Sequence, residues 1–189
     1  KWKMKEIVSL MDYRSSIKVV DATLRDGGLV NDFYFTDEFV KSLYEANIRA
    51  GVDYMEMGYK ASKEMFDENK FGKWKFCDDD DIREIVGDND TSLKLAVMAD
   101  VGRCNYKRDI VSRSESPIDL IRVATYVNTI PAAADMIEDA KKKGYEVSCN
   151  IMAISSCQES DLRVALDILG KTSADIFYVV DSYGSLYPE

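Results

Sequence analysis

The feature that most constrains the fold of this chain is a regular alternation of short β-type runs with helical patterns. Runs rich in β-branched and apolar residues lie at residues 17–23, 53–59, 93–99, 118–125, 145–152 and 174–181. Strands that alternate with helices indicate βαβ units, and hence a parallel sheet with right-handed crossovers. Two architectures fit this pattern: a doubly wound open sheet, and most of an eight-stranded (β/α) barrel.

The helical patterns between these runs have recognisable ends. Thr36 is a capping residue for a first helix, and Gly51 follows its last turn. We expect this helix to bury a face made of Phe39, Leu43, Ala46 and Ala50. A second helix begins at Thr129 and ends in a basic stretch before Gly144, where cations favour a helix C-terminus. A third begins at Ser160.

Polar residues at the strand ends favour the barrel. Neither phosphate-binding fingerprint of the open sheets, G-x-G-x-x-G or the P-loop, is present in the sequence. In a barrel the outward side chains pack under helices, so polar strand residues point inward or lie at the rim, and catalytic residues occur at the carboxyl ends. Period-2 alternation places Asp21, Thr23 and Arg25 on one face of the first strand. Later runs carry Glu56, Arg122, Ser148, Asn150 and Asp181.

Composition excludes several classes of function. The chain has 25 basic and 34 acidic residues, a net charge of −9 and no histidine. No Ser-His-Asp triad, His-ligated zinc or histidine base can therefore be built from these residues. The acidic balance argues against nucleic acid and anionic membranes as partners, and no apolar run has the length of a transmembrane helix. Four cysteines without C-x-x-C spacing indicate a reducing, cytoplasmic compartment.

The sharpest motif is Thr23-Leu24-Arg25-Asp26-Gly27-Gly28, at the end of the first expected strand. Arginine offers a planar, permanently charged fork that suits an enolate or a carboxylate. Aspartate offers a hard oxygen ligand for a divalent cation. We expect the two glycines to allow a sharp turn and the close approach of a ligand. An Arg–Asp ion pair beside a glycine turn is the alternative without a function.

The stretch VVDATLRDGG resembles the opening signature of the DRE-TIM metallolyases, which include 4-hydroxy-2-oxovalerate aldolases and acyl-CoA-dependent lyases and synthases. Further matches follow in register. YMEMG (54–58) is similar to the second-strand motif of the family, IRVAT (121–125) to its fourth strand and VVDSYGSLYP (179–188) to its sixth-strand motif. The resemblance covers residues 17–189 and is nearest to the 4-hydroxy-2-oxovalerate aldolase type.

The resemblance implies a lyase that uses a divalent metal, Mn²⁺ or Mg²⁺, to cleave or form a carbon–carbon bond next to a carbonyl. Asp26 matches the first-strand metal ligand, Arg25 the arginine that stabilises the enolate, and Glu56 the carboxylate that holds this arginine. We expect the substrate to be bound by Arg122, Asn150 and Asp181.

One departure from the family is large. The family supplies further metal ligands from a His-x-His on its seventh strand, and this sequence stops at Glu189, just after the sixth. A (β/α) barrel usually needs roughly 200–250 residues. We therefore expect a lead-in segment at 1–16, an N-terminal barrel portion with about six strands at 17–189, and the remaining metal ligands beyond Glu189. A degenerate member without a metal site is the alternative.

The functional hypothesis is an aldolase-type lyase that acts on a small 2-oxo acid or acyl substrate through an arginine-stabilised enolate. A synthase that condenses acetyl-CoA with a 2-oxo acid is the second hypothesis, and a non-catalytic barrel that serves as a binding module is the third. The aromatic residues of the segment 60–77 are interpreted as a lid or an interface, which allows for a homo-oligomer.

Overall fold

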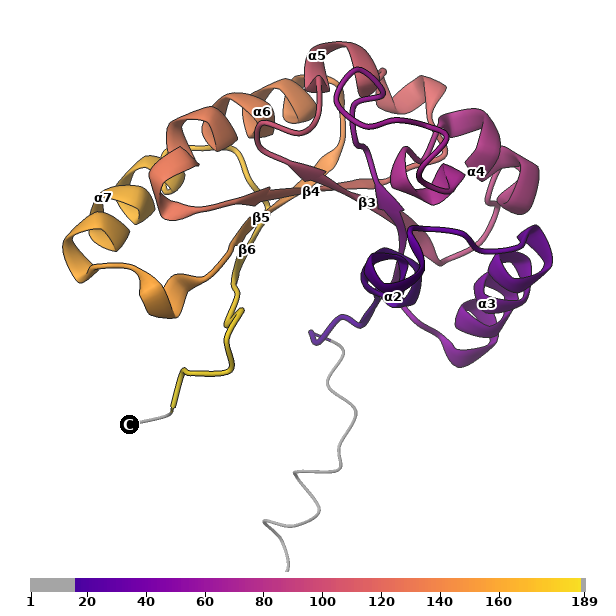
Figure 1. Ribbon diagram of the computed structural model, residues 1–189, viewed down its shortest axis with the longest axis horizontal. Helices are drawn as coiled ribbons and strands as arrows, with labels where there is room; N and C mark the ends of the chain where they lie inside the picture. The colour runs from indigo at the N-terminus through magenta and orange to yellow at the C-terminus, as the bar shows by residue number, and fades with distance from the viewer. Residues whose placement is uncertain (1–15, 188–189) are drawn as a thin grey trace, which may run out of the picture.

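The sheet dominates the computed structural model, which describes residues 16–187; the segment predicted at 1–16 lies, but for its last residue, outside the described residues. Within the described part, six parallel strands pair in chain order: β1 (Val20–Asp21), β2 (Tyr54–Tyr59), β3 (Lys94–Asp100), β4 (Leu120–Thr125), β5 (Glu146–Ile151) and β6 (Ile176–Val179). The sheet curls into an arc with helices along its convex side (Figure 1). This confirms the predicted α/β fold, a partial (β/α) barrel of six strands.

The helices follow the strands as a (β/α) pattern requires. The α-helices are α2 (Thr23–Asn31), α3 (Asp37–Ala50), α4 (Asp79–Val86), α5 (Tyr106–Asp109), α6 (Ile130–Lys142) and α7 (Glu159–Leu169). Short 3₁₀ turns are η1 (Lys73–Lys75), η2 (Arg113–Glu115), η3 (Val127–Thr129) and η4 (Ile154–Ser156). Within residues 16–187, no helix has both the length and the apolar character that a bilayer span requires.

The predicted ends of α3 are confirmed, but its predicted apolar face is confirmed only in part, because Leu43 packs against the core and Phe39 does not. The Thr36 hydroxyl accepts the Phe39 N–H at 3.2 Å, and Gly51 ends the helix with a φ of 70°. The side chains turned to the core are those of Val40, Tyr44 and Asn47. Phe39 is 46% exposed and stacks on Phe35 at the surface, with ring centroids 5.6 Å apart. The apolar face is therefore rotated by one residue, because aromatic stacking satisfies Phe39 outside the core.

The first strand is shorter than predicted, and its faces are reversed. The helix α2 begins at Thr23, so Arg25 lies on a helix and not on the strand. The Asp21 carboxylate accepts the Thr23 N–H at 3.3 Å, a local side-chain contact that competes with continued strand pairing. Asp21 also accepts a hydrogen bond from Asn47 of α3 at 2.9 Å and so faces the helical layer, whereas Val20 packs toward the interior of the arc.

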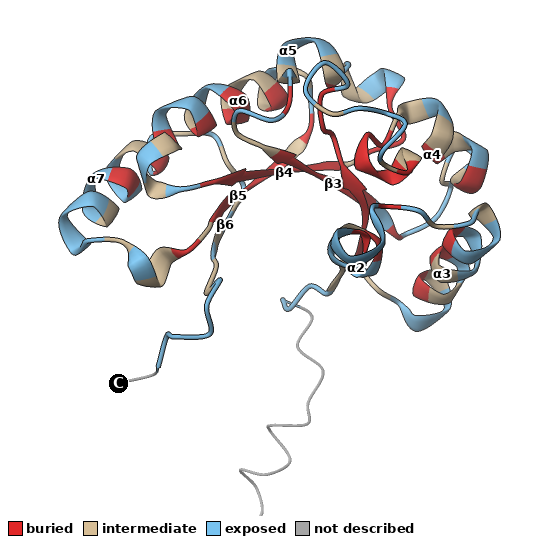
Figure 2. Cartoon of the chain, viewed as in Figure 1, coloured by how far each residue is buried: buried red, intermediate tan, exposed pale blue. Residues whose placement is uncertain are grey.

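The two faces of the sheet bury different side chains. The convex face is apolar and packs against the helices in one large core, which includes Met55, Met57, Leu95, Val97, Ile121, Val123, Val147 and Cys149. Burial is dense along β2, β3, β4 and β5, and Figure 2 shows the last three of these strands in red. On the concave face, Tyr54, Ala96 and Leu120 form a small apolar layer with Val20. Beyond this layer, toward the carboxyl ends, the concave face becomes polar.

The aromatic residues of the segment 60–77 belong to the core, so their interpretation as a lid or an interface is wrong. Trp74 is fully buried and Phe76 is 4% exposed, and Phe66 and Phe71 pack against the same cluster. The physical reason is a close approach to β2: a Cβ on Gly58 would lie 2.0 Å from the Trp74 carbonyl oxygen. The missing side chain at Gly58 lets this segment fold onto the sheet.

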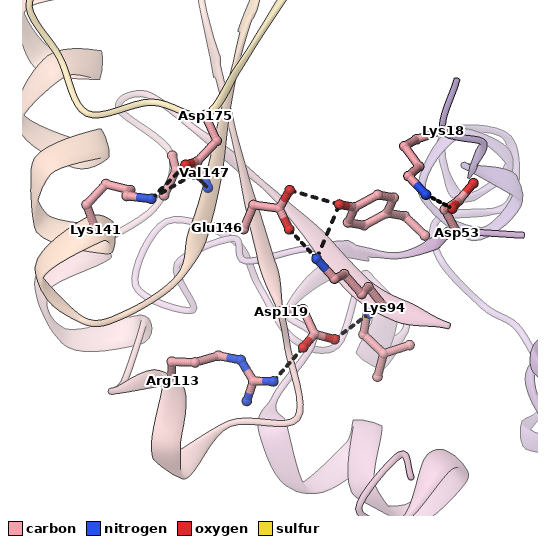
Figure 3. Close-up of polar contacts among 11 residues, drawn as sticks. Lys18, Asp53, Lys94, Arg113, Asp119, Lys141, Glu146, Val147 and Asp175 are labelled. Carbon is pink, nitrogen blue, oxygen red and sulfur yellow. Dashed lines mark hydrogen bonds and ion pairs between the residues drawn. The ribbon is translucent and has the colours of Figure 1, made fainter. Parts of the chain in front are cut away.

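The amino ends of the strands are joined by paired carboxylates (Figure 3). Asp53, Asp119 and Asp175 each precede an even-numbered strand, and each accepts a backbone N–H at the start of the strand before it: Val19, just ahead of β1, at 2.9 Å, Leu95 at 2.9 Å and Val147 at 2.8 Å. Each also pairs with a cation, respectively Lys18, Arg113 and Lys141. A further group on the concave face joins Glu146 to the Tyr54 hydroxyl and to Lys94, both at 2.8 Å.

Candidate active site at the carboxyl ends of the strands

A buried carboxylate with two arginines is the most prominent polar group of the concave face. The Glu56 side chain, on β2, is fully buried. Its Oε2 accepts a hydrogen bond from Arg25 Nε at 2.9 Å and forms an ion pair with Arg122 Nη1 at 2.6 Å. Arg25 Nη1 also pairs with the exposed carboxylate of Asp26 at 2.8 Å. Burial by itself lowers the pKa of the Arg25 guanidinium, but the attraction of Glu56 outweighs it and raises that pKa.

The local sequence explains how Arg25 reaches Glu56. Arg25 lies in the first turn of α2, which packs on β2 through the buried residues Leu24 and Gly28. A Cβ on Gly28 would lie 2.2 Å from the Phe33 ring. Gly28 therefore permits close packing inside a helix, which differs from the sharp turn predicted for the two glycines. Helix packing, and not a loop, positions the arginine.

Several buried polar atoms of this region have no hydrogen-bond partner among the described residues. They are Glu56 Oε1, Arg122 Nε and Asp100 Oδ1; Trp74 Nε1 in the core and Asp139 Oδ2 on α6 share this property. A buried polar atom without a partner costs free energy, about 1–3 kcal/mol. The first three belong to the carboxyl-end half of the concave face, where a bound ligand or water can satisfy them. Unused hydrogen-bonding capacity at one place is a mark of a binding site.

A β-bulge adds Tyr59 to this face. Glu56 pairs with Ala96 and Tyr59 pairs with Met98, so β2 contains one more residue than β3 between these two pairs. Gly58 lies in this bulge and has a φ of 155°. The register places Tyr59 on the same side as Met98 and Arg122. Burial and Asp100 raise the pKa of the Tyr59 phenol, while Arg25 opposes them. A glycine inside a strand is the signal that could have predicted the bulge.

Lys75 lies beside this group in an aromatic enclosure. Its Nζ is 4.9 Å from the ring centroid of Phe33, 4.7 Å from Tyr59, 4.6 Å from Phe66 and 5.5 Å from Phe71. Ring faces attract a cation, but burial lowers the pKa of the Lys75 ammonium. The sequence analysis missed this residue, because a lysine between aromatic residues has the same pattern as a solvated loop.

The remaining predicted residues lie farther along the sheet. Asn150 is buried on β5, where its Oδ1 accepts a hydrogen bond from Ser148 at 3.2 Å. In register, Ser148 lies opposite Arg122, and Asn150 is two pairs nearer the carboxyl end. Asp181 follows β6 and accepts the Ser185 and Leu186 N–H groups at 3.0 and 2.9 Å. These backbone hydrogen bonds lower the pKa of the Asp181 carboxyl, so it holds a turn in this structure.

The surroundings of Asp26 differ from those of a metal ligand. Its carboxylate is 69% exposed and pairs with Arg25. Among residues 16–187 there is no group of three or more His, Cys, Asp or Glu side chains that could hold a metal ion. A divalent cation needs about six donors, so Asp26 alone does not form a site. The described residues therefore do not fit a resident metal by themselves.

Comparison with known proteins places this geometry in context. No protein-family model matches the chain. It is 26% identical over 176 residues to a 4-hydroxy-2-oxovalerate aldolase of Bacillus cereus, an alignment covering 91% of this chain and 50% of the relative. The corresponding aldolase of Pelotomaculum thermopropionicum is 27% identical, with 91% and 50% covered. An oxaloacetate decarboxylase of Mycobacterium tuberculosis is 26% identical over 184 residues, with 90% and 49% covered.

A solved structure agrees with these relatives. The N-terminal domain of a candidate aldolase from Bacteroides vulgatus superposes with a TM-score of 0.66 and 25% identity, over 91% of this chain and 56% of that one. The chain thus spans about half the length of the relatives that it matches. The resemblance to the DRE-TIM metallolyases is therefore confirmed: across nine-tenths of its length, this chain is a homologue of proteins named as carbon–carbon lyases.

Proposed function

We propose that the protein is a carbon–carbon lyase that acts on a small 2-oxo acid. It cleaves the aldol bond next to the carbonyl group and forms the enolate of the shorter 2-oxo acid. The observation that carries this proposal is the buried Glu56, which holds the guanidinium groups of Arg25 and Arg122 on one face at the carboxyl ends of the strands. Catalytic residues of (β/α) barrels occur at this end of the sheet. The names of the homologues agree with such a reaction.

The roles of the residues follow from their surroundings. A guanidinium carries five N–H donors in one plane, so Arg25 retains donors beyond those that Glu56 and Asp26 engage. These donors stabilise the enolate oxygen as the carbon–carbon bond breaks. Arg122, whose buried Nε has no partner among residues 16–187, binds the substrate carboxylate together with Asn150. Asp181 supports the rim through the turn that it holds.

Metal dependence is part of the proposal only in a limited sense. Asp26 would be one ligand of Mn²⁺ or Mg²⁺, and the other ligands would come from residues that the structure does not describe. Such a cation, when bound, polarises a carbonyl oxygen. The contribution of this chain is independent of it: Glu56 orients the arginines, and the concave face excludes water around them.

The test is an assay of pyruvate release from 4-hydroxy-2-oxovalerate by the full-length protein, with and without added Mn²⁺. We expect release by the wild-type protein and a strong loss in Arg25→Lys. Arg163→Lys is the matched control, since Arg163 pairs with Glu159 through Nε at 3.1 Å but is exposed on α7. An inactive wild-type protein across a series of 4-hydroxy-2-oxo acids and oxaloacetate would overturn the proposed function.

A further inference from the structure

The proposed reaction needs a group that takes a proton, and the sequence provides no histidine for it. The end of β3 supplies a different candidate. Asp100 is the last residue of this strand and pairs with Ala124 of β4, two pairs beyond Met98 and Arg122 and therefore on the same face. It therefore lies on the concave face, nearer the rim than the arginines that Glu56 holds. Catalytic groups of barrel enzymes occupy this position.

The surroundings of Asp100 leave its carboxylate almost without partners. Its side chain is 16% exposed, and its Oδ1 is buried without a hydrogen bond from any described residue. The one ion pair found for it in the described part joins Oδ2 to the exposed Arg103 at 3.8 Å, the outer limit of such a contact. The Asp181 carboxylate accepts backbone N–H groups of the residues that follow it. For the Asp100 carboxylate, no such hydrogen bond is found within residues 16–187.

Charged groups surround Asp100 from several elements. Burial has the largest effect and raises the pKa of the carboxyl; Arg103, Lys75 and Arg25 oppose it, and the charge of Glu56 raises the pKa further. The charge of Asp100 also raises the pKa of the Tyr59 phenol. The result is a carboxyl group that exchanges its proton closer to neutral pH than an ordinary aspartate does.

The contrast with Glu56 separates two roles. Glu56 is engaged by two guanidinium groups and is committed to positioning them. Asp100, on the neighbouring strand and the same face, has no such commitment. Two carboxylates in unlike environments are the arrangement by which enzymes divide electrostatic and proton-transfer work. Tyr59 stays protonated at neutral pH because its pKa is raised, and Lys75 is enclosed by four rings.

We propose that Asp100 is the general base of the lyase reaction. This assignment rests on the proposed function and names the proton-transfer group of that same site. The carboxylate takes the proton of the substrate's 4-hydroxyl group, whose oxygen forms the aldehyde carbonyl. The C3–C4 bond breaks, and its electron pair becomes the enolate of the 2-oxo acid at Arg25. Protonated Asp100 then returns the proton to C3, which yields pyruvate and regenerates the carboxylate.

Decarboxylation offers an internal comparison. Loss of CO₂ from oxaloacetate yields the same enolate of pyruvate, but it requires no proton to be removed from a hydroxyl group. A base that acts on the hydroxyl is therefore needed in aldol cleavage and not in the bond-breaking step of decarboxylation. An arginine that stabilises the enolate is needed in both. The two reactions thus distinguish Asp100 from Arg25 within one protein.

The experiment measures both reactions in the full-length wild-type protein and in Asp100→Asn, Asp100→Ser and Asp100→Glu. Asp80→Asn is the matched control, because Asp80 is fully exposed on α4. We expect Asp100→Asn to lower cleavage of 4-hydroxy-2-oxovalerate by about 10²–10⁴, the usual contribution of a general base, and the ratio of cleavage to decarboxylation by about 10². Asp100→Glu should recover part of the cleavage activity. If Asp100→Asn does not fold, Asp100→Ser provides the same test of lost cleavage activity.

The pH dependence gives a second readout. Cleavage by the wild-type protein should fall on the acid side as Asp100 becomes protonated, and this limb should be missing from the residual activity of Asp100→Asn. Equal losses of cleavage and decarboxylation, or an unchanged ratio between them, would overturn the assignment and leave the proposed function intact. A wild-type protein that catalyses neither reaction would overturn both.

Discussion

The two ends of the curved sheet use carboxylates in opposite ways. At the amino ends, each of Asp53, Asp119 and Asp175 is engaged by a backbone N–H and a cation (Figure 3). At the carboxyl ends, Glu56 and Asp100 each keep a buried oxygen without a partner among the described residues. The amino-end aspartates connect neighbouring strands and stabilise the fold. Each carboxyl-end carboxylate keeps an oxygen that can accept a hydrogen bond from a bound substrate.

The difference teaches how one residue type serves two purposes in a barrel sheet. A carboxylate whose hydrogen bonds are complete adds stability and has no capacity left for a ligand. One whose bonds are incomplete costs stability and retains that capacity. Enzymes commonly lose stability at the site of their chemistry for this reason. Substitution of Asp100 and substitution of the amino-end aspartates should therefore have opposite effects on stability, and only substitutions at the carboxyl end should lower activity.

The largest expected effect is at the carboxyl end, in Arg25→Lys. An ammonium group cannot reproduce the planar fork that pairs with Glu56 through Nε, so the enolate loses an oriented donor. We expect kcat for aldol cleavage to fall by about 10²–10³, the usual cost of one lost transition-state donor. Steady-state kinetics of the full-length enzyme, with Arg163→Lys beside it, provides the measurement. A normal kcat in Arg25→Lys would remove the arginine from the mechanism.

Glu56→Gln should reduce both stability and turnover. Loss of the charge leaves the guanidinium groups of Arg25 and Arg122 without their shared buried partner. Breaking a buried ion pair from one side costs about 3–5 kcal/mol. Chemical denaturation measures the free energy of unfolding, and Glu159→Gln, at an exposed pair on α7, is the control. If both variants unfold like the wild-type protein and keep its kcat, Glu56 does not position the arginines.

At the amino end, Asp119→Asn should reduce stability and leave turnover unchanged. Asp119 accepts the Leu95 N–H at 2.9 Å and pairs with Arg113, so the amide weakens the connection between β3 and β4. Hydrogen bonds to a charged group contribute about 1.5–3 kcal/mol, and the partial exposure of Asp119 favours the lower figure. Denaturant titration gives the stability and the pyruvate assay gives kcat. A strong loss of kcat in a folded Asp119→Asn protein would break the distinction between the two ends.

The smallest expected effects are pH-dependent changes in Tm with opposite signs. Burial raises the pKa of the Asp175 carboxyl, but hydrogen bonds from Lys141 and the Val147 N–H outweigh it and lower that pKa overall. Its contribution to stability is present above its ordinary pKa of 3.8 and is lost as pH falls through the lower folded value. Asp175→Asn should therefore lower Tm at neutral pH, and the difference should vanish in acid.

Asp100→Asn should do the reverse. The folded pKa of Asp100 is raised above 3.8, so its ionised form destabilises the fold at neutral pH. The amide should raise Tm by a few degrees there, and the gain should fade as pH falls through the raised pKa and Asp100 takes up its proton. Calorimetry of both variants between neutral and acidic pH provides the comparison. Shifts of the same sign in Asp100→Asn and Asp175→Asn would contradict the contrast.

Much of the fold could be predicted from the sequence, because each strand from β2 to β5 is a largely buried run between clear helix ends. The first strand could not. The motif at 23–28 had the alternation of a strand, but the Asp21 carboxylate ends β1 by binding the Thr23 backbone, and α2 begins there. Local side-chain contacts of this kind override periodicity over two or three residues.

The site was predicted in part. Sequence placed Arg25, Glu56 and Arg122 among the candidates, and the structure joins the three in one cluster. Tyr59 was missed because the bulge at Gly58 shifts the parity of β2, and period-2 counting assumes that no residue is inserted. Asp100 was missed because it ends an apolar run and was assigned to the loop that follows. The register between neighbouring strands places both Tyr59 and Asp100 on the concave face, and it cannot be read from the sequence of one strand alone.

The most direct test of the central claim is the exchange of the pyruvate methyl protons with D₂O, followed by proton NMR. Exchange requires the enolate and no aldehyde, so it tests enolate formation alone, the step assigned to Arg25 together with proton transfer at C3 by Asp100. The comparison is between the full-length wild-type protein, Arg25→Lys and Arg113→Lys, since Arg113 forms the matching pair with Asp119 at the amino end. We predict exchange by the wild-type protein and Arg113→Lys, and a rate about 10²-fold lower in Arg25→Lys. Equal rates in the two variants, or no exchange in the wild-type protein, would contradict the account.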